Sequence, residues 1–363
     1  MTFGRSFRLL LAVLALGLLA VACEADPDEE VADDPDEEAP EAEDPDDGEI
    51  SLTYAFFAPE GTFPAVQMEE WADRLEERTD GQVTVDTFPG GTLLGAEDMY
   101  DGVAEGVADI GLGSPGYDVG RFPLSSGIAL PVGFPNSTVA SLAFWELLEE
   151  YQPAELYDDF KLLTAFTTEP GHAQTTEPVE SLEDFEGLTI RAGGSGVPAL
   201  EALGADAVGM PMPEVPEAVE TGVIDGTLTS REVLQDFALA ENLGYVTEHP
   251  TVVVSFAAVM RQDDFDALPA DVQEEIEALG PEMAEWTGQY HDTENVEAAL
   301  DWAQSEHGLE IIQLDEAEAA RWDEALEPLI DDWLAQAEEA GLPGEEFLDR
   351  MIELRDELAE EHG

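Results

Sequence analysis

The chain has 363 residues, with 85 acidic and 12 basic side chains and a formal net charge of −73. Charge of this sign repels nucleic acid and therefore excludes a nucleic-acid-binding protein. The 44% of hydrophobic residues excludes a wholly disordered chain. Repulsion of this size is tolerated where salt shortens the Debye length to about 3 Å at 1 M. The composition thus indicates the surface of a halophile protein, and an acidic mesophilic protein is the alternative.

The N-terminal segment has the layout of an export signal. Arg5 and Arg8 precede an apolar run, residues 9–19, which is too short to span a membrane. The residues before Cys23 fit the cleavage box of a bacterial lipoprotein. Cys23 is the single cysteine, so a disulfide framework is excluded. We expect residues 1–23 to be a lipoprotein signal peptide with Cys23 as the lipidated first mature residue; a plain signal peptide is the alternative.

The next segment, residues 24–49, has a composition typical of disorder. It contains sixteen Asp or Glu and four Pro among 26 residues, and no aromatic residue. Such a segment cannot bury enough apolar surface to offset the entropy of ordering. We expect an acidic, extended tether. The alternative, a functional acidic tail, requires a basic partner that the sequence does not imply.

From residue 50 the apolar pattern alternates between the periods of strands and helices. Predicted strands cover 50–57, 83–88, 109–113 and 161–168, and predicted helices cover 63–79, the segment around Met99 and Val103, and 137–151. This order predicts a mostly parallel sheet whose carboxyl edge carries function. Phe56, the Gly90–Gly91 turn and Ser114–Gly116 would share that edge, and each can also be purely structural.

The stretch 181–226 is the most informative. Strands and helices alternate there as in βαβ units, with strands predicted at 188–192 and 205–210 and helices at 197–203 and 214–221. Arg191 stands at the end of the first of these strands, before Gly193, Gly194 and Gly196. Strand ends that lead into glycine turns bind ligands in open α/β sheets, and a guanidinium matches a carboxylate or phosphate. The alternative for Arg191 is a surface ion pair at the sheet edge.

The last third of the chain is mainly helical. A predicted strand at 251–260 returns the chain to the first sheet. A helical pattern then runs over 269–307, and we expect Gly280-Pro281 to interrupt it. Two further amphipathic helices are predicted at 315–341 and 345–361.

In order and spacing, these motifs resemble the substrate-binding subunits of tripartite ATP-independent periplasmic (TRAP) transporters, dicarboxylate-receptor type. The resemblance covers roughly residues 50–312 and rests on Ser181–Gly187, Arg191, Leu203–Ala205, Met210–Pro211 and Thr221–Gly226, together with Trp71–Tyr117 and Gly120–Pro135. It implies an α/β, two-lobed periplasmic-binding-protein-like fold with a hinge and a long C-terminal helix across both lobes. At 1.5 Å per residue, 281–307 would extend about 40 Å.

The resemblance also implies domain boundaries. Lobe I would comprise residues 50–168 and 251–280. Lobe II would comprise residues 169–250 and 281–363, including the C-terminal helices. The ligand would lie between them, with Arg191 and Phe56 among the residues that bind it.

The segment 171–176 departs from the family pattern. The resemblance places a second ligand-binding arginine there, but this chain has Ala173. The second basic contact is therefore either absent or replaced by His172, and Gln174 is a further ligand-binding candidate. An ordinary loop histidine is the alternative for His172.

A second departure follows Gly226. Family members that bind ligands through a cation have an acidic residue shortly after this glycine, whereas this chain has Thr227, Leu228, Thr229 and Ser230. We therefore expect no metal in the site. Thr229 or Ser230 would donate a hydroxyl to the ligand, and a helix N-cap at Ser230 is the alternative.

The sequence carries no strong catalytic pattern. It has no G-x-S-x-G, no phosphate loop and no His-Glu-x-x-His, and its five histidines lack metal-ligand spacing. We expect neither an enzyme nor a cofactor. A two-lobed extracytoplasmic hydrolase remains an alternative that lacks a nucleophile–base pair, and a surface adhesin or sensor-input module is another.

The resemblance implies a receptor outside the cytoplasm, attached by its lipid to the outer face of the cell membrane. It would bind a small carboxylate and deliver it to the membrane subunits of a TRAP permease. A receptor for an ATP-driven importer is the alternative within the same class. The carboxylate stays open among dicarboxylates, keto acids, hydroxy acids, sugar acids and zwitterionic osmolytes.

Overall fold

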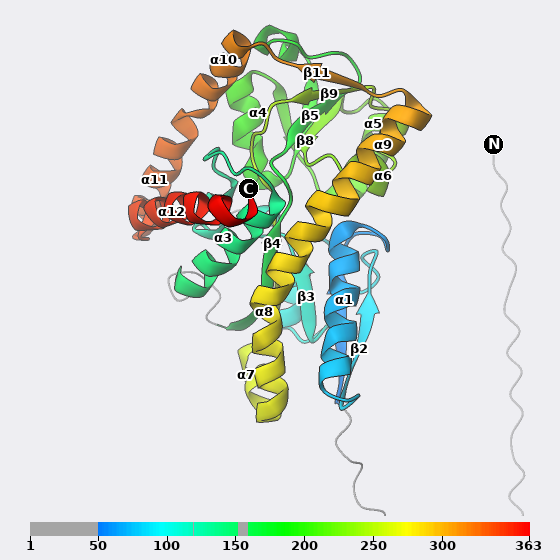
Figure 1. The fold of residues 1–363 in the computed structure, drawn as a ribbon, viewed down its shortest axis with the longest axis vertical. Coiled ribbons are helices and arrows are strands. Elements are labelled where there is room, and N and C mark those ends of the chain that lie inside the picture. Colours follow the sequence, from blue (N-terminus) through cyan, green and yellow to red (C-terminus); the bar gives the residue numbers. More distant parts are fainter. Residues whose placement is uncertain (1–49, 119, 152–158) are drawn as a thin grey trace, which may run out of the picture. The chain divides into compact units, whose positions relative to one another are not determined.

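The computed structural model describes residues 50–118, 120–151 and 159–363. The predicted signal peptide, tether and Cys23 lie outside the described residues. The described residues form two β-sheets with helices packed on them, and they belong to one compact unit (Figure 1). The predicted α/β fold with two lobes is confirmed.

The first sheet has five strands in the order β2-β1-β3-β10-β4. Their bounds are β1 Ile50–Phe56, β2 Val83–Phe88, β3 Ile110–Gly113, β4 Phe160–Thr167 and β10 Ser255–Arg261. β1 pairs in parallel with β2 and β3, whereas β10 lies antiparallel between β3 and β4. Four strands thus run in one direction and one in the other, so the sheet is mostly parallel as predicted.

Helices pack on this first sheet through their buried apolar residues. They are α1 Phe63–Arg78, α2 Met99–Ala104, α3 Ser137–Tyr151 and, after β10, α7 Gln262–Ala267. In α1 the buried Met68, Trp71 and Leu75 recur at spacings of three and four and so lie on one face. Trp71 meets Tyr54 of β1 edge to face, with ring centroids 5.5 Å apart.

The second sheet has six strands in the order β11-β9-β5-β8-β6-β7. The bounds are β5 His172–Thr175, β6 Thr189–Ala192, β7 Asp206–Gly209, β8 Gly226–Thr229, β9 Tyr245–Glu248 and β11 Glu310–Gln313, and the short helices between them are α4 Val197–Leu203, α5 Val215–Glu220 and α6 Val233–Asp236. β6 pairs in parallel with β7 and β8. The alternative of a loop at His172 is wrong, because His172 begins a buried strand.

Two neighbouring segments connect the sheets. Thr168 N–H donates to the Val254 carbonyl (2.8 Å) and Gly171 N–H to the Val252 carbonyl (2.7 Å). Thr251 N–H donates in return to the Gly171 carbonyl (3.0 Å). These bonds explain why β10 begins at Ser255 instead of residue 251: the four preceding residues cross between the sheets.

The long C-terminal helix crosses both lobes, but its irregularity lies elsewhere than expected. α8 runs unbroken over Ala270–Tyr290 with Pro281 inside it, and a π-helical turn at His291–Asn295 leads into α9, Val296–His307. The predicted interruption at Gly280-Pro281 is therefore wrong. Tertiary packing accounts for this: the Gly280 carbonyl accepts a hydrogen bond from Thr164 Oγ1 (3.0 Å), and a Cβ at Gly280 would lie 2.4 Å from Trp145.

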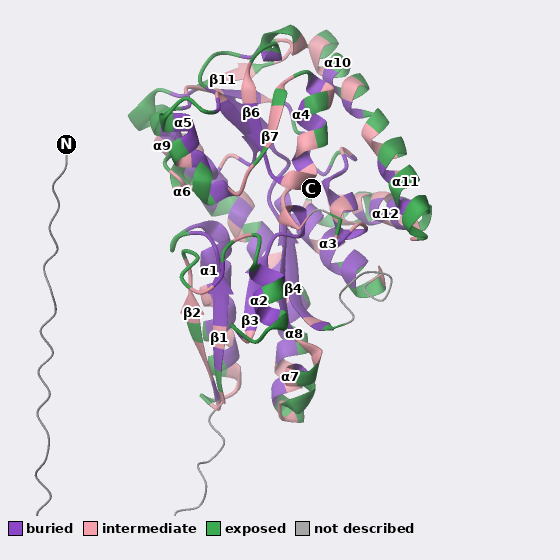
Figure 2. Ribbon diagram, turned by 180° about the vertical axis from the view of Figure 1, so that it is seen from behind, coloured by how far each residue is buried: buried purple, intermediate pink, exposed green. Residues whose placement is uncertain are grey.

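The remaining helices are α10 Glu316–Leu326, α11 Pro328–Ala340 and α12 Gly344–His362. The single helix predicted over 315–341 is wrong, because Pro328 begins a new helix. Phe347, Met351 and Leu354 of α12 share an apolar core with α3. Figure 2 shows mostly buried strands in the first sheet and largely exposed outer faces on α10 to α12. Among the described residues, no helix is both long and apolar enough for a membrane span.

Candidate functional site

Arg191 is the one lysine or arginine of the described residues that lacks an acidic partner. Every other lysine and arginine in that part of the chain lies within 4.0 Å of a carboxylate. Arg191 is only 1% exposed, and its Nε donates to the Met210 carbonyl (2.7 Å). Its Nη2 donates to the Tyr117 hydroxyl (3.1 Å). Both partners are neutral, so the guanidinium charge is buried without compensation from a carboxylate.

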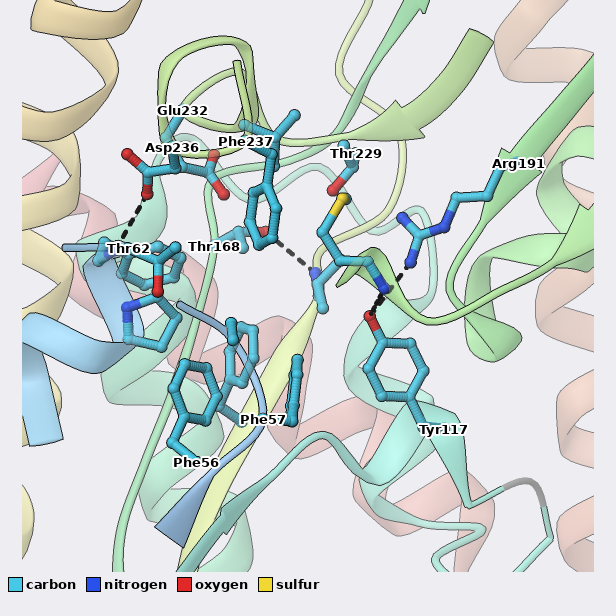
Figure 3. Close-up of a pocket in the computed structure, with 17 residues that line it drawn as sticks. Phe56, Phe57, Thr62, Tyr117, Thr168, Arg191, Thr229, Glu232, Asp236 and Phe237 are labelled. Carbon is cyan, nitrogen blue, oxygen red and sulfur yellow. Dashed lines mark hydrogen bonds between the residues drawn. The ribbon is translucent and has the colours of Figure 1, made fainter. Parts of the chain in front are cut away.

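This guanidinium lines a pocket with mainly aromatic walls (Figure 3). The space not filled by protein atoms is about 420 Å³, part of it open to solvent. The rings come from both lobes: Phe56, Phe57, Phe63, Tyr117, Phe237 and Phe256. Phe57 packs on Phe56 at 4.5 Å and on Tyr117 at 5.6 Å between ring centroids. The lining therefore matches the chemistry of a small molecule that has an apolar body and an anionic group.

The fold brings these residues together at strand ends. β1 ends at Phe56 and β8 at Thr229, and both residues line the pocket. β6 runs parallel to β8, with Arg191 opposite Thr227, so the two strands end at the same edge. This is the carboxyl edge at which α/β sheets bind ligands. The glycine turn after β6 does not belong to this site, since Gly194 lines a separate pocket.

Two carboxyl groups lie on the side of the pocket away from Arg191, as Figure 3 shows for Glu232 and Asp236. The Asp236 Oδ2 accepts from Phe63 N–H at the start of α1 (3.0 Å), and its Oδ1 accepts from Asn295 Nδ2 (3.2 Å). Burial raises the pKa of Asp236 to about 6. Burial, and then the neighbouring Asp236, raise the pKa of Glu232 well above its usual value.

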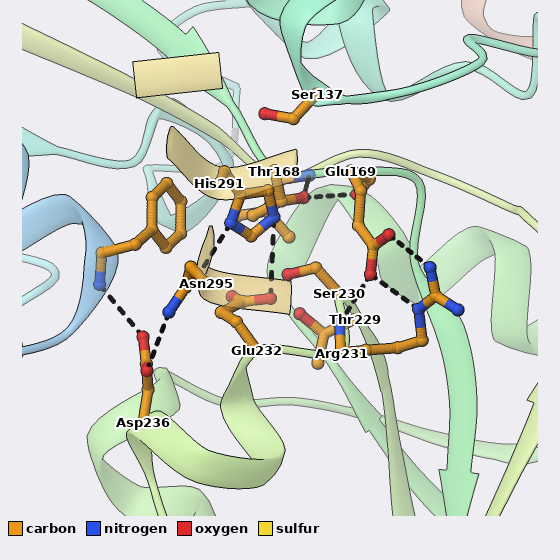
Figure 4. A network of polar contacts seen from close by, with 12 residues as sticks. Ser137, Thr168, Glu169, Thr229, Ser230, Arg231, Glu232, Asp236, His291 and Asn295 are labelled. Atoms are coloured by element: carbon orange, nitrogen blue, oxygen red, sulfur yellow. Dashed lines mark hydrogen bonds and ion pairs between the residues drawn. The ribbon is translucent and has the colours of Figure 1, made fainter. Parts of the chain in front are cut away.

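Beside the Glu232 carboxyl lies the Ser230 hydroxyl, which lowers the pKa of Glu232 less than burial raises it. Glu232 is 3% exposed, and its Oε2 has no hydrogen-bond partner among the described residues. The nearest basic atom is His291 Nε2 at 3.8 Å (Figure 4). Burial lowers the pKa of His291, which favours a neutral ring, and His291 Nδ1 lies 3.1 Å from Asn295 Oδ1. The pocket is thus basic at one end and carboxylic at the other.

The structure brings together three of the six predicted ligand-binding residues. Arg191, Phe56 and Thr229 line the pocket, whereas His172, Gln174 and Ser230 do not. The Gln174 amide donates to the Thr229 carbonyl (3.1 Å) and to the Ser230 carbonyl (2.8 Å), so it fixes the end of β8. Ser230 is not a helix N-cap, because α6 begins at Val233 after Glu232.

His172 belongs to a different polar cluster. It is buried in β5, opposite Thr229, and burial lowers the pKa of its imidazole to about 4, with Arg231 adding to the effect. The cluster around it contains Glu169, Arg231 and Glu248. His172 therefore does not replace the missing arginine in this pocket.

Fourteen of the seventeen pocket residues were not ligand-binding candidates from the sequence, among them Tyr117, Glu232, Asp236 and Phe237. The available signal was weak. Tyr117 directly follows Ser114–Gly116, which the pattern placed at the carboxyl edge, but no pattern marks the tyrosine itself. Glu232 and Asp236 are spaced to share one side of a helical turn, yet they are two of 85 acidic residues. Across residues 50–118, 120–151 and 159–363, no three His, Cys, Asp or Glu side chains gather as a metal site.

Comparisons with known proteins agree with this architecture. A TRAP periplasmic solute-binding protein from Desulfovibrio salexigens is 46% identical, with a TM-score of 0.76, and the match covers 85% of this chain and 96% of that one. One from Bordetella bronchiseptica, with bound (R)- and (S)-mandelate, is 28% identical, with a TM-score of 0.79 and coverage of 85% and 99%. The C4-dicarboxylate-binding periplasmic protein DctP of Rhodobacter capsulatus is 28% identical over 300 residues, 74% of this chain and 80% of the relative.

A family model described as bacterial extracellular solute-binding protein, family 7 (DctP), matches residues 55–337. That match includes strands of both sheets, the two segments that connect the sheets (residues 168–171 and 251–254) and the pocket residues. The chain belongs to this family of solute-binding proteins.

Proposed function

We propose that this protein is the extracytoplasmic receptor of a TRAP transporter, which captures a small organic acid and delivers it to an ion-gradient-driven membrane permease. The observation that carries the proposal is Arg191: a buried guanidinium without an acidic partner in the described part of a chain with 85 acidic residues. A carboxylate that accepts two hydrogen bonds from this fork would compensate its charge.

Contacts between the lobes beside the pocket support a closing mechanism. The Tyr117 hydroxyl, from the first lobe, accepts from Arg191 Nη2 and from Met212 N–H (3.1 Å), both in the second. Asp236 accepts from Phe63 N–H across the same gap. A ligand that contacts both walls favours the closed form, so its affinity includes the balance between open and closed lobes.

The walls favour a carboxylate with an apolar ring or chain. Six aromatic side chains line the pocket, and Arg191 is the only lysine or arginine among its lining residues. Mandelate, which the Bordetella bronchiseptica protein binds, joins a ring to a carboxylate in this way. We propose ligands of this size and polarity for this chain.

The test compares acids with their amides. Isothermal titration in molar salt with benzoate, mandelate and hexanoate, and with the three corresponding amides, separates charge from shape. At least one acid should bind, stabilise the protein against heat, and bind at least ten times more tightly than its amide. A ligand at 100 times its dissociation constant adds about 2.7 kcal/mol to the free energy of unfolding. If an amide binds as tightly as its acid, Arg191 does not recognise a carboxylate and the proposal fails.

We propose a receptor without catalysis and without a divalent metal. Support comes from the family and from the missing acidic residue after Gly226. A bound acid should be recovered unchanged by mass spectrometry, and a chelator should leave its affinity unchanged. Product formation, or affinity that a divalent ion restores after chelation, would contradict this. The receptor of an ATP-driven importer and the hydrolase gain no specific support from the pocket.

We propose that Cys23 is lipidated and that residues 24–49 tether the receptor to the outer face of the membrane. The support is the apolar run before Cys23 and the acidic composition after it. Cys23→Ser should move the protein from the membrane fraction to the soluble fraction of its native host. An intact mass without a lipid increment would refute lipidation.

We propose adaptation to high salt from the net charge of −73. Dilution from molar salt to about 0.01 M lengthens the Debye length from about 3 to about 30 Å, so carboxylates repel over longer distances. The thermal midpoint should fall on dilution and recover when salt is restored. A midpoint that does not change over this range would count against the adaptation.

A further inference from the structure

The end of the pocket away from Arg191 has a chemistry of its own. Glu232 and Asp236 line it from adjacent turns around α6, and Figure 3 shows both on the opposite side of Phe237 from Arg191. Of the described basic side chains, only Arg191 lines this pocket, and it lies at the other end. At their own end, Glu232 and Asp236 therefore face no lysine or arginine that lines the pocket. A ligand long enough to pass Phe237 from Arg191 would bring its second end to these two groups.

The two carboxyl groups differ in what they can still accept. Asp236 already accepts from Phe63 N–H and Asn295 Nδ2, one bond on each oxygen. Glu232 Oε2 has no hydrogen-bond partner among the described residues, although Glu232 is 3% exposed. Buried polar atoms normally have partners, so an unpartnered oxygen that lines a ligand pocket points to a group on the ligand.

The surroundings decide which group this is. The Glu232 carboxyl faces Ser230, Asp236 and Glu169, and His291 on the π-helical turn. Burial already raises the pKa of Glu232 and of Asp236, so a second carboxylate of the ligand would bring a further negative charge into a buried space that disfavours it. A hydroxyl or an amine would instead donate a hydrogen bond to the free oxygen, and an ammonium would add charge complementarity.

We infer that the ligand is a monocarboxylate with a hydrogen-bond donor, a hydroxyl or an amine, at the end away from its carboxylate. Glu232 receives this donor with Asp236 beside it, and the same pair rejects dicarboxylates. The inference rests on the proposed function and narrows it: hydroxylated or amino-substituted acids are ligands, and their unsubstituted and dicarboxylic analogues are poor ones.

The experiment uses matched ligand series and the mature chain in molar salt. One series is benzoate, 3- and 4-hydroxybenzoate, 4-methoxybenzoate and terephthalate; the other is hexanoate, 6-hydroxyhexanoate, 6-aminohexanoate and adipate. In at least one series a hydroxyl or amino compound should bind at least ten times more tightly than the unsubstituted acid. The diacid should bind at least ten times more weakly than the unsubstituted acid, and 4-methoxybenzoate, which accepts but does not donate, should gain nothing.

Glu232→Met removes both acceptor oxygens at similar length, and Glu232→Gln keeps one. In Glu232→Met the ratio of hydroxy-acid to unsubstituted-acid affinity should fall to near one, and Glu232→Gln should keep part of the difference. Glu201→Gln, the same change on the exposed face of α4, is the matched control and should leave the ratio unchanged. The ligand series on the wild-type chain decides the matter even if Glu232→Met fails to fold.

The outcomes separate this inference from the proposed function. If acids bind and amides do not, but a hydroxyl or amine adds nothing or a diacid binds best, the inference is overturned and the receptor function stands. A ratio that survives Glu232→Met also overturns the role of Glu232. If no acid binds in preference to its amide, both fail.

Discussion

Arg191 and Arg231 lie in the same lobe, near the carboxyl ends of neighbouring strands, yet their surroundings are opposite. Arg231 donates from Nε and Nη2 to the two oxygens of Glu169 (2.8 and 2.7 Å) and from Nη1 to Glu248 (2.8 Å). Its backbone N–H also donates to Glu169 (3.0 Å), as Figure 4 shows for this cluster. Arg191 donates to a carbonyl and a hydroxyl and meets no carboxylate among the described residues.

The difference separates two uses of the same side chain. Glu169 lies in the segment after β4 that connects the two sheets, and Arg231 follows β8 in the second lobe. Their ion pair therefore attaches this connecting segment to the second lobe. The guanidinium compensates the Glu169 carboxylate and lowers its pKa although burial opposes this. Where acidic side chains are so abundant, a paired arginine is the ordinary case. The unpaired one at the pocket indicates binding.

The largest effect should follow removal of Arg191. Arg191→Ala takes away the charge that a carboxylate needs in a closed pocket, and loss of one member of a buried charge pair costs about 2–5 kcal/mol, roughly 30- to several-thousand-fold in affinity. Arg191→Lys should also weaken binding substantially, because an ammonium lacks two parallel donors. Titration calorimetry with the tightest acid of the panel measures both.

Arg321→Ala serves as the control for this series, since Arg321 pairs with Glu183 and Glu318 on the exposed surface. It should leave affinity unchanged. Arg191→Ala should leave the unliganded protein folded, because no carboxylate loses its partner. Arg191→Lys with wild-type affinity would show that Arg191 is structural.

Arg231→Met should have the opposite profile. It leaves the buried Glu169 without its bidentate partner, and breaking such a pair destabilises proteins by about 3–5 kcal/mol. We expect about 3 kcal/mol, because Glu248 is only partly buried and water can compensate it. Chemical unfolding in molar salt measures the loss. An unfolding free energy within about 0.5 kcal/mol of wild type would show that the cluster is not a structural fastener.

The same contrast separates what could be predicted from the sequence from what depends on the tertiary structure. Period and glycine position located β2, α3 and α4 at their observed bounds and placed Arg191 in a strand before a turn, because these signals are local. The pairing of Arg231 is not local: Glu169 lies 62 positions away and meets it only after the hinge folds back. The sequence marks Arg191 by its place before a glycine turn, but no pattern shows that Arg231 is paired with a carboxylate and Arg191 is not.

The misplaced candidates have a physical explanation too. His172–Thr175 is a four-residue strand of mixed polarity, too short for its period to show, so no pattern opposes the expectation from the resemblance that His172 takes the place of an arginine. Glu232 is informative because its Oε2 has no hydrogen-bond partner among the described residues, and Asp236 because it accepts from Phe63 N–H of the other lobe. Both properties depend on the tertiary structure. In the sequence this pair cannot be distinguished from the many other acidic pairs of the chain.

His172 offers a third test, through pH. Its pKa is lowered from 6.5 to about 4, so below pH 6.5 the unfolded chain binds a proton that the folded protein does not. The stability it contributes is complete above pH 6.5 and is lost as pH falls toward 4. Between pH 7 and 5 the wild type should lose about 2 kcal/mol more than His172→Gln.

In this pH comparison, His249 and His291, whose pKa values burial also lowers, are common to both proteins and cancel in the difference. Denaturant unfolding at several pH values and constant salt gives the two curves. Parallel curves would mean that His172 accepts a proton freely in the folded protein, as a solvated site residue would.

The smallest effect concerns the hydroxyl that links Arg191 to the other lobe. Tyr117→Phe removes the oxygen that accepts from Arg191 Nη2 and Met212 N–H, while the ring that packs on Phe57 stays. A net hydrogen bond is worth about 0.5–1.5 kcal/mol, so affinity should fall about 2- to 12-fold.

The loss of affinity in Tyr117→Phe should appear mainly as faster ligand release, because the hydroxyl joins the lobes only when they are closed. Stopped-flow measurement of association and dissociation rates checks this. Tyr151→Phe is the control, because the Tyr151 ring packs on Phe347 and does not line the pocket. A slower association with unchanged release would instead place Tyr117 in the capture of the ligand by the open form.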